Sequence, residues 1–246
     1  MARVIIALAE RDFDPTEAAV PWSTLSEAGH DVRFATESGA VAACDPKMLT
    51  GVLLGQVKAT PENAARYAKM IDDPRYLAPL RFADLVADDF DLLVLPGGHA
   101  QGMRQYLEST ALQRFVVAAF DADLLVGSIC HGGVVLARSQ RNNNGVSVIS
   151  GRRVTALPRR FERGAWMVSK PFYGDYFRTY PEWVQDEVEA ALGASGSFEA
   201  GPVLPVYSRA FVVQDGNLIT ARWPGDAALF SDRLVEALAK RSGEDA

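Results

Sequence analysis

Residues 127–133, with the sequence GSICHGG, place a lone cysteine where a nucleophile is expected. The apolar run at residues 124–126 predicts a short strand that is buried on both faces. A helix is predicted to follow, so the chain must turn sharply at Cys130. Such a turn requires small residues two positions to either side of the nucleophile, and Ser128 and Gly132 meet this requirement. A thiol at the start of a helix is also expected to favour its thiolate form. The pattern predicts a cysteine nucleophile elbow.

Each of the two cysteines has a plainer alternative, a small buried apolar side chain with no chemical role. Cys44 lacks the flanking small residues and the strand–turn–helix pattern, so we expect it to be inert. The surroundings of Cys130 favour the nucleophile over this alternative.

The three histidines have different expected roles. His131 directly follows Cys130 and is the candidate base, because an imidazole beside a thiol can take or return its proton. Adjacent helical residues point about a third of a turn apart, so His131 need not contact the thiol, and an imidazole that meets solvent is the alternative. His99 follows a Pro-Gly-Gly turn and either orients a substrate or caps the helix behind it. His30, in a helix-to-strand loop, is expected at the surface.

Two further groups could complete the chemistry around the thiol. Gly98 has no side chain, so its N–H can approach a developing oxyanion together with the N–H of His131; the alternative is a simple glycine turn. Glu17 could be a protonated carboxyl that donates a hydrogen bond to the thiolate. The alternative is that Glu17 only stabilises the start of its own helix. Asp14 is a good N-cap residue, and Glu17 is placed to complete a capping box with it.

Apolar runs and turn residues predict alternating strands and helices around these groups. A strand at residues 3–9, a helix at 15–28 that Gly29 ends, and a strand at 31–35 form the first unit. The other predicted elements are strands at 91–95 and 124–126, helices at 112–122 and 134–138, a turn at 142–145, short strands at 146–149 and 153–156, a largely helical segment at 158–192, a hairpin at 210–213 and 218–221, and a helix at 225–241.

This alternation predicts one α/β domain over residues 1–246, with a doubly wound, mostly parallel sheet sandwiched by helices. Residues 42–88 contain four prolines and no predicted strand, and a helix is predicted at residues 61–71. We interpret this segment as an insertion that packs over one edge or covers a pocket. In such sheets the ligand crevice lies beyond the carboxyl ends of the strands. Residues 10–12, residues 97–99 and Cys130 all follow such ends, so we expect them to converge.

Composition narrows the possible partners. A net charge of −6 argues against nucleic acid and anionic membrane, since both require a basic face. Two cysteines are too few for a disulfide framework and fit a reducing, cytoplasmic location. Neither a secretory leader nor a run of the ~20 apolar residues of a membrane helix is expected.

These features together resemble the ThiJ/PfpI superfamily, which has a class I glutamine amidotransferase-like, flavodoxin-type fold. The elbow combined with the Pro-Gly-Gly turn and the early glutamate is specific, whereas any one of them alone is weak. The matching segments cover about residues 3–140 and come in the family's order: Pro15-Thr16-Glu17 with Val20-Pro21, residues 28–36, residues 95–99 and residues 128–132.

The resemblance implies roles for four residues. Cys130 is the nucleophile, Glu17 is the carboxyl that contacts its sulfur, and Gly98 and His131 provide the oxyanion donors. The insertion at residues 42–88 makes the chain look closest to the branch of heat-inducible chaperones and glyoxalase III enzymes. Members of that branch convert methylglyoxal to lactate without glutathione; others in the superfamily are peptidases, deglycases, isocyanide hydratases or redox-sensing chaperones. Many relatives are homodimers, which implies self-association.

The chain departs from the family's pattern in two places. Some relatives carry an acidic residue after a Phe-Pro pair, completing a Cys-His-acid triad. Here Pro158 is followed by Arg159, and Glu162 is the nearest carboxylate. Metal-binding members have His and Glu in the insertion, whereas residues 42–88 contain no histidine, so we expect no metal.

Arg178 and Arg222, in the C-terminal part of the chain, either bind a substrate carboxylate or phosphate or have a structural role, and the structural role is favoured. No nucleotide or cofactor motif is present, so a small molecule is the expected partner.

Three functions fit these observations. The first is a cofactor-independent enzyme in which Cys130 adds to a small reactive carbonyl, Gly98 and His131 stabilise the oxygen, and Glu17 or His131 moves protons. The second is a stress-responsive chaperone or oxidant sensor in which Cys130 is oxidised. The third is an acyl-transfer or hydratase enzyme for amides, isonitriles or peptides. An acidic residue within reach of His131 would favour the third function over the first.

Overall fold

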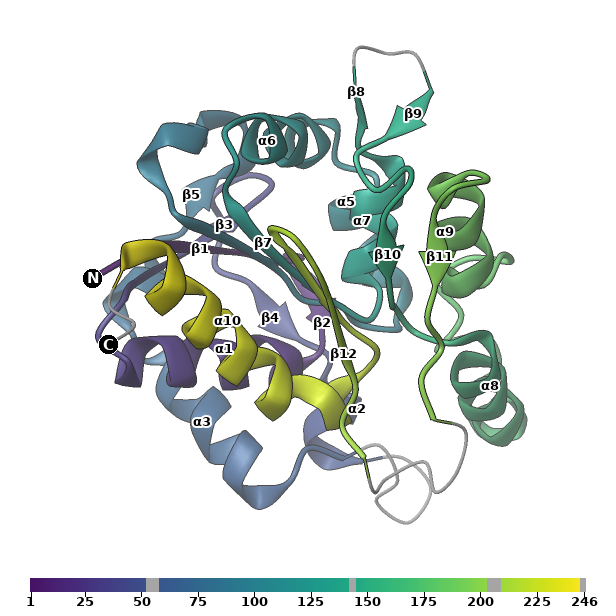
Figure 1. The fold of residues 1–246 in the computed structure, drawn as a ribbon. Helices are drawn as coiled ribbons and strands as arrows, with labels where there is room; N and C mark the ends of the chain where they lie inside the picture. Colours follow the sequence, from purple (N-terminus) through teal and green to yellow (C-terminus); the bar gives the residue numbers. More distant parts are fainter. Residues whose placement is uncertain (52–57, 142–144, 203–208, 244–246) are drawn as a thin grey trace.

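A computed structural model describes residues 1–51, 58–141, 145–202 and 209–243. Within them, a seven-stranded sheet has the order β12-β13-β7-β6-β1-β3-β5 (Figure 1). Neighbouring strands run parallel, except that β12 and β13 form an antiparallel hairpin. The predicted mostly parallel α/β sheet is confirmed. Its strands are β1 (Arg3–Ala7), β3 (Asp31–Thr36), β5 (Leu80–Arg81), β6 (Leu92–Leu95), β7 (Leu125–Ile129), β12 (Val212–Asp215) and β13 (Leu218–Ala221).

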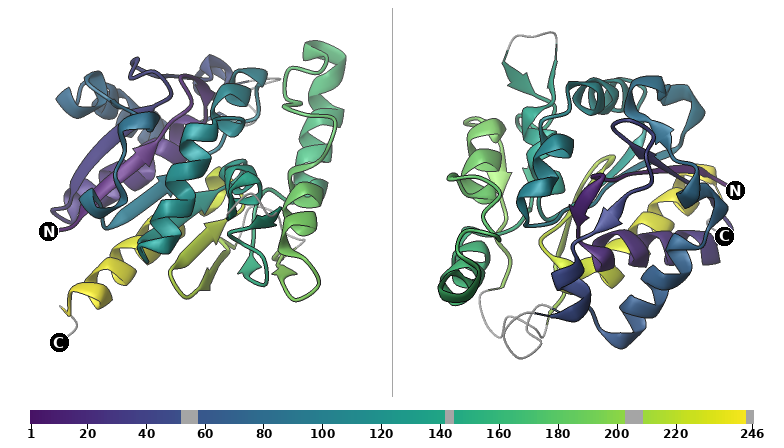
Figure 2. Two further views of the ribbon diagram at one scale, coloured as in Figure 1. Left: turned by 90° about the horizontal axis from the view of Figure 1, so that it is seen from above. Right: turned by 180° about the vertical axis from the view of Figure 1, so that it is seen from behind.

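Helices cover both faces of the sheet (Figures 1 and 2). On one face α1 packs beside α10, with α3 on the outer side of α1. The other face is covered by α6 and α7, and α8 and α9 lie beyond α7. The helices are α1 (Pro15–Glu27), α2 (Pro46–Thr50), α3 (Pro61–Ile71), α4 (Pro74–Leu77), α5 (Arg104–Leu107), α6 (Thr110–Asp121), α7 (Gly132–Arg138), α8 (Arg159–Tyr173), α9 (Val184–Leu192) and α10 (Ala227–Ser242).

Short polar side chains fix where three of these helices begin. Asp14, Thr60 and Ser109 each accept a hydrogen bond from a backbone N–H in the first turn of α1, α3 and α6, respectively. Pro15 and Pro61 occupy the first position of their helices, where the missing N–H has no cost. These local signals explain why the predicted starts of α1 and α3 agree with the structure.

The central strands bring the predicted residues to one edge of the sheet. β1 lies between β6 and β3, so the strand order reverses at β1, and in such sheets ligands bind at the carboxyl ends of the strands next to this switch point. Residues 97–99 follow β6 and Cys130 follows β7, which is the next strand along. β6 and β7 are buried throughout, as the apolar runs at residues 92–95 and 124–126 predict.

The prediction that residues 42–88 contain no strand is wrong. β4 (Ala43–Cys44) pairs with β2 (Arg11–Phe13), and β5 pairs with β3 at the edge of the main sheet. Both strands have two residues, which is too short for an alternating pattern to be visible in the sequence. The predicted helix at 61–71 is confirmed as α3. The assignment of one domain with an insertion stays a prediction.

Two predicted strands are shorter than expected and lie outside the main sheet. β9 (Val146–Ser147) pairs with β8 (Gln140–Arg141), and β10 (Arg153–Val154) pairs with β11 (Ser197–Phe198). Of the turn predicted at 142–145, residues 142–144 lie outside the described residues. Across the described ranges, no helix has both the length and the apolar character needed to cross a bilayer.

Candidate active site

Cys130 lies on the sharp turn that the sequence predicts. Its φ of +58° falls in the left-handed region, which is sparsely populated for a residue with a side chain. The turn fits because Gly132 packs tightly against the backbone of β6, where an added Cβ would overlap the carbonyl oxygen of Leu95. The Cys130 N–H donates to the carbonyl oxygen of Ala221, 3.1 Å away in β13. The thiol is therefore held, fully buried, between β7 and the start of α7.

His131 contacts the thiol directly. Its Nδ1 atom lies 3.5 Å from Cys130 Sγ, and the side chain is 1% exposed. The helical offset between adjacent residues does not apply here, because Cys130 itself is not helical. The alternative of a solvent-facing histidine is wrong.

Glu17 projects from α1 toward the elbow and is completely buried. Its Oε2 atom accepts a hydrogen bond from the Gly97 N–H at 2.8 Å, whereas Oε1 has no hydrogen-bond partner among the residues that the structure describes. The capping-box alternative is wrong, since the Asp14 N–H donates to the carbonyl oxygen of Gly97 instead of to Glu17. Asp14 alone caps the helix, through the N–H groups of Thr16 and Glu17.

Gly97 is the glycine that permits this approach, and the sequence analysis did not single it out. A Cβ on Gly97 would lie 2.6 Å from His131 N, 2.9 Å from Cys130 Cβ and 2.9 Å from Glu17 Oε2. Gly98 packs instead against the Asp12 carbonyl and the Met103 side chain. The Gly97 N–H is occupied by Glu17, while the Gly98 N–H donates to none of the residues that the structure describes.

Burial and neighbouring charges set the protonation of the site. Burial, followed by the nearby Asp14 carboxylate, raises the pKa of Glu17 well above its usual value, which favours the protonated carboxyl. Burial raises the pKa of the Cys130 thiol, against a smaller effect of the His131 N–H, which favours the thiolate. The expectation that the helix start favours the thiolate is therefore wrong for the resting site. Burial keeps His131 neutral by lowering its pKa.

His99 lies beside the other imidazole. The His99 and His131 rings have centroids 5.0 Å apart and planes inclined by 71°. Burial lowers the pKa of His99 to about 4, so its ring is neutral at pH 7. The helical turn that follows, Gln101–Met103, has Ala100 at its cap position and no side-chain cap, so the capping alternative for His99 is wrong.

Thr179 is the site residue that the sequence analysis missed. Its Oγ1 atom lies 3.2 Å from His131 Nε2 and donates a hydrogen bond to the carbonyl oxygen of His99 at 2.7 Å. The segment containing Thr179 has no regular secondary structure, so neither periodicity nor a strand end pointed to it.

Glu162 does not reach His131. Its carboxylate accepts hydrogen bonds from the Val184 N–H at 3.0 Å and from Arg178 at 3.4 Å. Burial raises the pKa of Glu162 to about 7. The Arg178 guanidinium lies 3.4 Å from the centroid of the Trp183 ring. These contacts give Glu162 and Arg178 a structural role in the C-terminal part of the chain.

Arg222 is buried and also has structural contacts. It forms a bidentate pair with Asp226, with distances of 2.8 and 2.9 Å, and donates to the Arg209 carbonyl oxygen. Cys44 is buried outside the elbow, and burial raises its thiol pKa to about 11, which agrees with its expected inertness.

Three side chains of the site could hold a metal ion. One ligand atom each from His99, Cys130 and His131 lie within 4.8 Å of one another. Two neutral imidazoles and a thiolate are the ligand types that Zn²⁺ prefers. The expectation of no metal was based on the insertion and did not consider this cluster; it stays a prediction.

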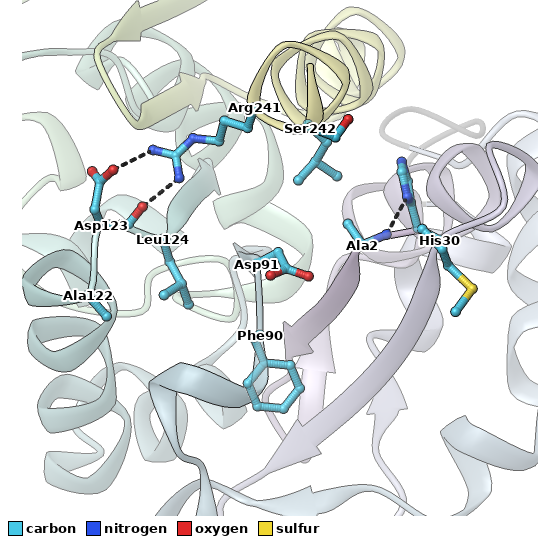
Figure 3. Close-up of a pocket in the computed structure, with 11 residues that line it drawn as sticks. Ala2, His30, Phe90, Asp91, Ala122, Asp123, Leu124, Arg241 and Ser242 are labelled. Carbon is cyan, nitrogen blue, oxygen red and sulfur yellow. Dashed lines mark hydrogen bonds and ion pairs between the residues drawn. The ribbon is translucent and has the colours of Figure 1, made fainter. Parts of the chain in front are cut away.

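A pocket of about 360 Å³ lies at the opposite end of the sheet, where β1, β6 and β7 begin (Figure 3). His30 lines this pocket and is half-buried, and its Nδ1 atom accepts a hydrogen bond from the Ala2 N–H at 3.1 Å. Arg241 and Asp123 form an ion pair on its other side. The pocket contains none of the residues around Cys130.

Several known proteins are similar to this chain in sequence or in fold. Relatives include a deglycase of Pyrococcus abyssi, which is 26% identical over 96% of this chain and 99% of its own length. A glutathione-independent glyoxalase of Schizosaccharomyces pombe is 25% identical over 91% of this chain and 87% of its own. The crystal structure of glyoxalase III from Candida albicans shares the fold, with a TM-score of 0.68, 19% identity and coverage of 96% of this chain and 97% of that one. The model of the ThiJ/PfpI family-like proteins matches residues 8–202, and the chain belongs to this family.

Proposed function

We propose that the protein is a cofactor-independent enzyme that converts a small reactive 2-oxoaldehyde, of the methylglyoxal type, to a 2-hydroxy acid. The observation that carries the proposal is the contact of the Cys130 thiol with a neutral His131, beside a protonated Glu17. The glyoxalases and deglycases among the relatives support a carbonyl substrate.

The first step uses the contact between sulfur and imidazole. Cys130 Sγ adds to the aldehyde carbon while its proton passes to His131 Nδ1, and the proton then moves from His131 to the new oxygen, which completes a hemithioacetal. The Gly98 N–H, which has no acceptor among the described residues, donates a hydrogen bond to this oxygen. Glu17 keeps its proton, because its pKa is raised, and can donate a hydrogen bond to the sulfur as the thiol proton leaves.

The second step is an internal redox exchange. The hydrogen on the former aldehyde carbon leaves as a proton, which gives an enediol intermediate. The neighbouring carbonyl carbon then gains a proton, and the hemithioacetal is thereby converted to a thioester. The first carbon is thereby oxidised to a thioester and the second is reduced to an alcohol. Water then cleaves the thioester and restores the thiol. The sum is 2-oxoaldehyde plus water to 2-hydroxy acid, which requires no external oxidant or reductant.

Two observations rank this function above the alternatives. No acidic residue accepts from His131 among the described residues, which is unfavourable for a Cys-His-acid hydrolase. The raised pKa of the Cys130 thiol is unfavourable for an oxidant sensor, because peroxide reacts with thiolates.

The test is the consumption of methylglyoxal by purified protein in the absence of glutathione, with lactate measured as the product. We expect activity in the wild type and in Cys44→Ala, and loss of activity in Cys130→Ala. If the wild type and Cys130→Ala consume methylglyoxal at the same rate, the proposal fails.

The proposal includes a homodimer in the cytoplasm with no nucleic-acid or membrane partner. Light scattering on the purified protein at several concentrations tests the dimer. A monomer at all concentrations contradicts it.

A further inference from the structure

The segment from Arg178 to Pro181 places a buried hydroxyl against the candidate base. Thr179 is 1% exposed, and its Oγ1 atom has two polar neighbours, the carbonyl oxygen of His99 at 2.7 Å and His131 Nε2 at 3.2 Å. The proposed reaction assigns no task to this hydroxyl.

The protons at these three groups can be counted. A hydroxyl has one proton, and a carbonyl oxygen can only accept, so the Thr179 proton must lie on the line to His99. Oγ1 can then only accept from His131, which places a proton on Nε2. A neutral imidazole has a single N–H, so Nδ1 is unprotonated, and this is the atom that lies 3.5 Å from Cys130 Sγ.

We propose that Thr179 is a positioning residue that fixes His131 as the Nε2–H tautomer, so that Nδ1 is free to take the thiol proton. This inference rests on the proposed use of Cys130 as a nucleophile. Thr179 occupies the place where an acidic residue would complete a Cys-His-acid triad, but it has no charge. It orients the imidazole without stabilising an imidazolium, so the proton that His131 accepts must move on to the substrate.

The backbone around Thr179 is anchored independently of this contact. Arg104 Nε donates to the Thr179 carbonyl oxygen at 2.8 Å. Arg178 donates to the carbonyl oxygen of Pro181, and the Tyr180 hydroxyl binds Arg138 and Glu108 at 3.0 and 2.6 Å. The hydroxyl is thus fixed before a substrate arrives, as positioning requires.

Thr179→Val tests the inference, because it replaces the hydroxyl by a methyl group of similar size. Thr179→Ser keeps the hydroxyl. Thr155→Val is the matched control, since Thr155 is also buried but its Oγ1 atom has no hydrogen-bond partner in the described part of the chain. Thermal unfolding of all three variants shows whether each one folds.

The first readout is the tautomer of His131, measured by ¹⁵N NMR of its ring nitrogens. We expect the Nε2–H form in the wild type, Thr179→Ser and Thr155→Val, and a gain of the Nδ1–H form in Thr179→Val. The second readout is kcat for methylglyoxal, which should fall about 10- to 100-fold in Thr179→Val with little change in KM. A loss of this size is part of the rate enhancement that general acid–base catalysis contributes.

The two readouts separate the inference from the proposed function. Failure of the wild type to consume methylglyoxal, with the tautomer still dependent on the Thr179 hydroxyl, overturns the proposed function and leaves the positioning role intact. An unchanged Nε2–H tautomer in a folded Thr179→Val variant overturns the positioning role. So does a Thr179→Ser variant that behaves like Thr179→Val.

Discussion

The Nδ1 atom of His131 faces the sulfur of Cys130 at 3.5 Å, although the two residues are neighbours in the chain. Adjacent side chains in a helix or strand diverge, and here they meet because Cys130 has a left-handed backbone conformation. The same conformation buries the thiol. The site therefore gains a base in contact with the sulfur and loses the solvation that would stabilise a thiolate.

The resting thiol should react slowly with an alkylating agent. Because the pKa of Cys130 is raised, the thiolate fraction at pH 7 is smaller than that of a free cysteine, and it increases only at alkaline pH. We expect Cys130 in the folded protein to react with iodoacetamide at least about 10-fold more slowly than a small thiol at pH 7. Mass spectrometry of the peptide containing residue 130 measures the rate. Equal rates would contradict the protonated resting state.

Glu17→Gln should alter how stability depends on pH. The pKa of Glu17 is higher in the folded than in the unfolded state, so the folded state binds the proton more tightly. Its contribution is therefore present at acidic pH and is lost as the pH rises above the unfolded value. Glutamine is neutral at every pH, so the variant should lack this decline, which amounts to at most about 1.4 kcal/mol per pH unit.

Urea unfolding of the wild type and Glu17→Gln at pH 5 and pH 8 measures this difference. The variant should gain stability relative to the wild type between the two values. Parallel behaviour of the two proteins would show that Glu17 is ionised in the folded state.

Glu162→Gln should leave catalysis intact. Glutamine can still accept from the Val184 N–H, and Glu162 does not contact His131. We expect kcat/KM for methylglyoxal within about 3-fold of the wild type, as for a change away from the reacting atoms. A loss of more than about 100-fold, with folding preserved, would assign Glu162 to the catalytic machinery after all.

Gly132→Ala should destabilise the protein by about 1–3 kcal/mol, since a Cβ there overlaps the backbone of β6. The matched control is Gly164→Ala in α8, where no atom lies within 4 Å of the added Cβ. That change should stabilise the helix by about 0.5–1 kcal/mol. Urea unfolding compares the two, and equal stabilities would mean that the elbow tolerates a side chain.

Treatment with EDTA should leave activity unchanged, whereas added Zn²⁺ should inhibit the enzyme reversibly. His99, Cys130 and His131 could bind the ion together and remove the thiol from reaction. Activity assays with Zn²⁺, followed by EDTA, measure both effects, and His99→Ala should weaken the inhibition. Loss of activity after EDTA alone would show that the enzyme requires a metal.

The sequence predicted the residues at the strand ends better than their partners. Cys130, His131 and Gly98 follow local signals, because a sharp turn and a Pro-Gly-Gly segment each have a recognisable composition. The local signal around Glu17 favoured a capping box, and only the resemblance to the family placed this residue beside the sulfur. Thr179 had no such signal. Its contact with His131 spans 48 positions and depends on how the C-terminal part packs on the sheet, which no local pattern encodes.

The protonation state of the Cys130 thiol could not be predicted from the sequence either. A helix start favours a thiolate, but complete burial beside Glu17 has the opposite and larger effect on the pKa of Cys130. The contact of Gly97 with Glu17 was not predicted for a similar reason, because it depends on how α1 packs against the Pro-Gly-Gly turn. The short strands β4 and β5 depend on pairing with distant segments.

The hydrogen bond from Cys130 N–H to Ala221 has a consequence for biosynthesis. On one side β7 pairs with β13, residues 218–221, which are synthesised long after residue 130. On the ribosome, the elbow therefore emerges with this side unpaired and gains its partner only when β13 follows. A chain cut between the elbow and β13 should carry the cysteine without its reactive geometry.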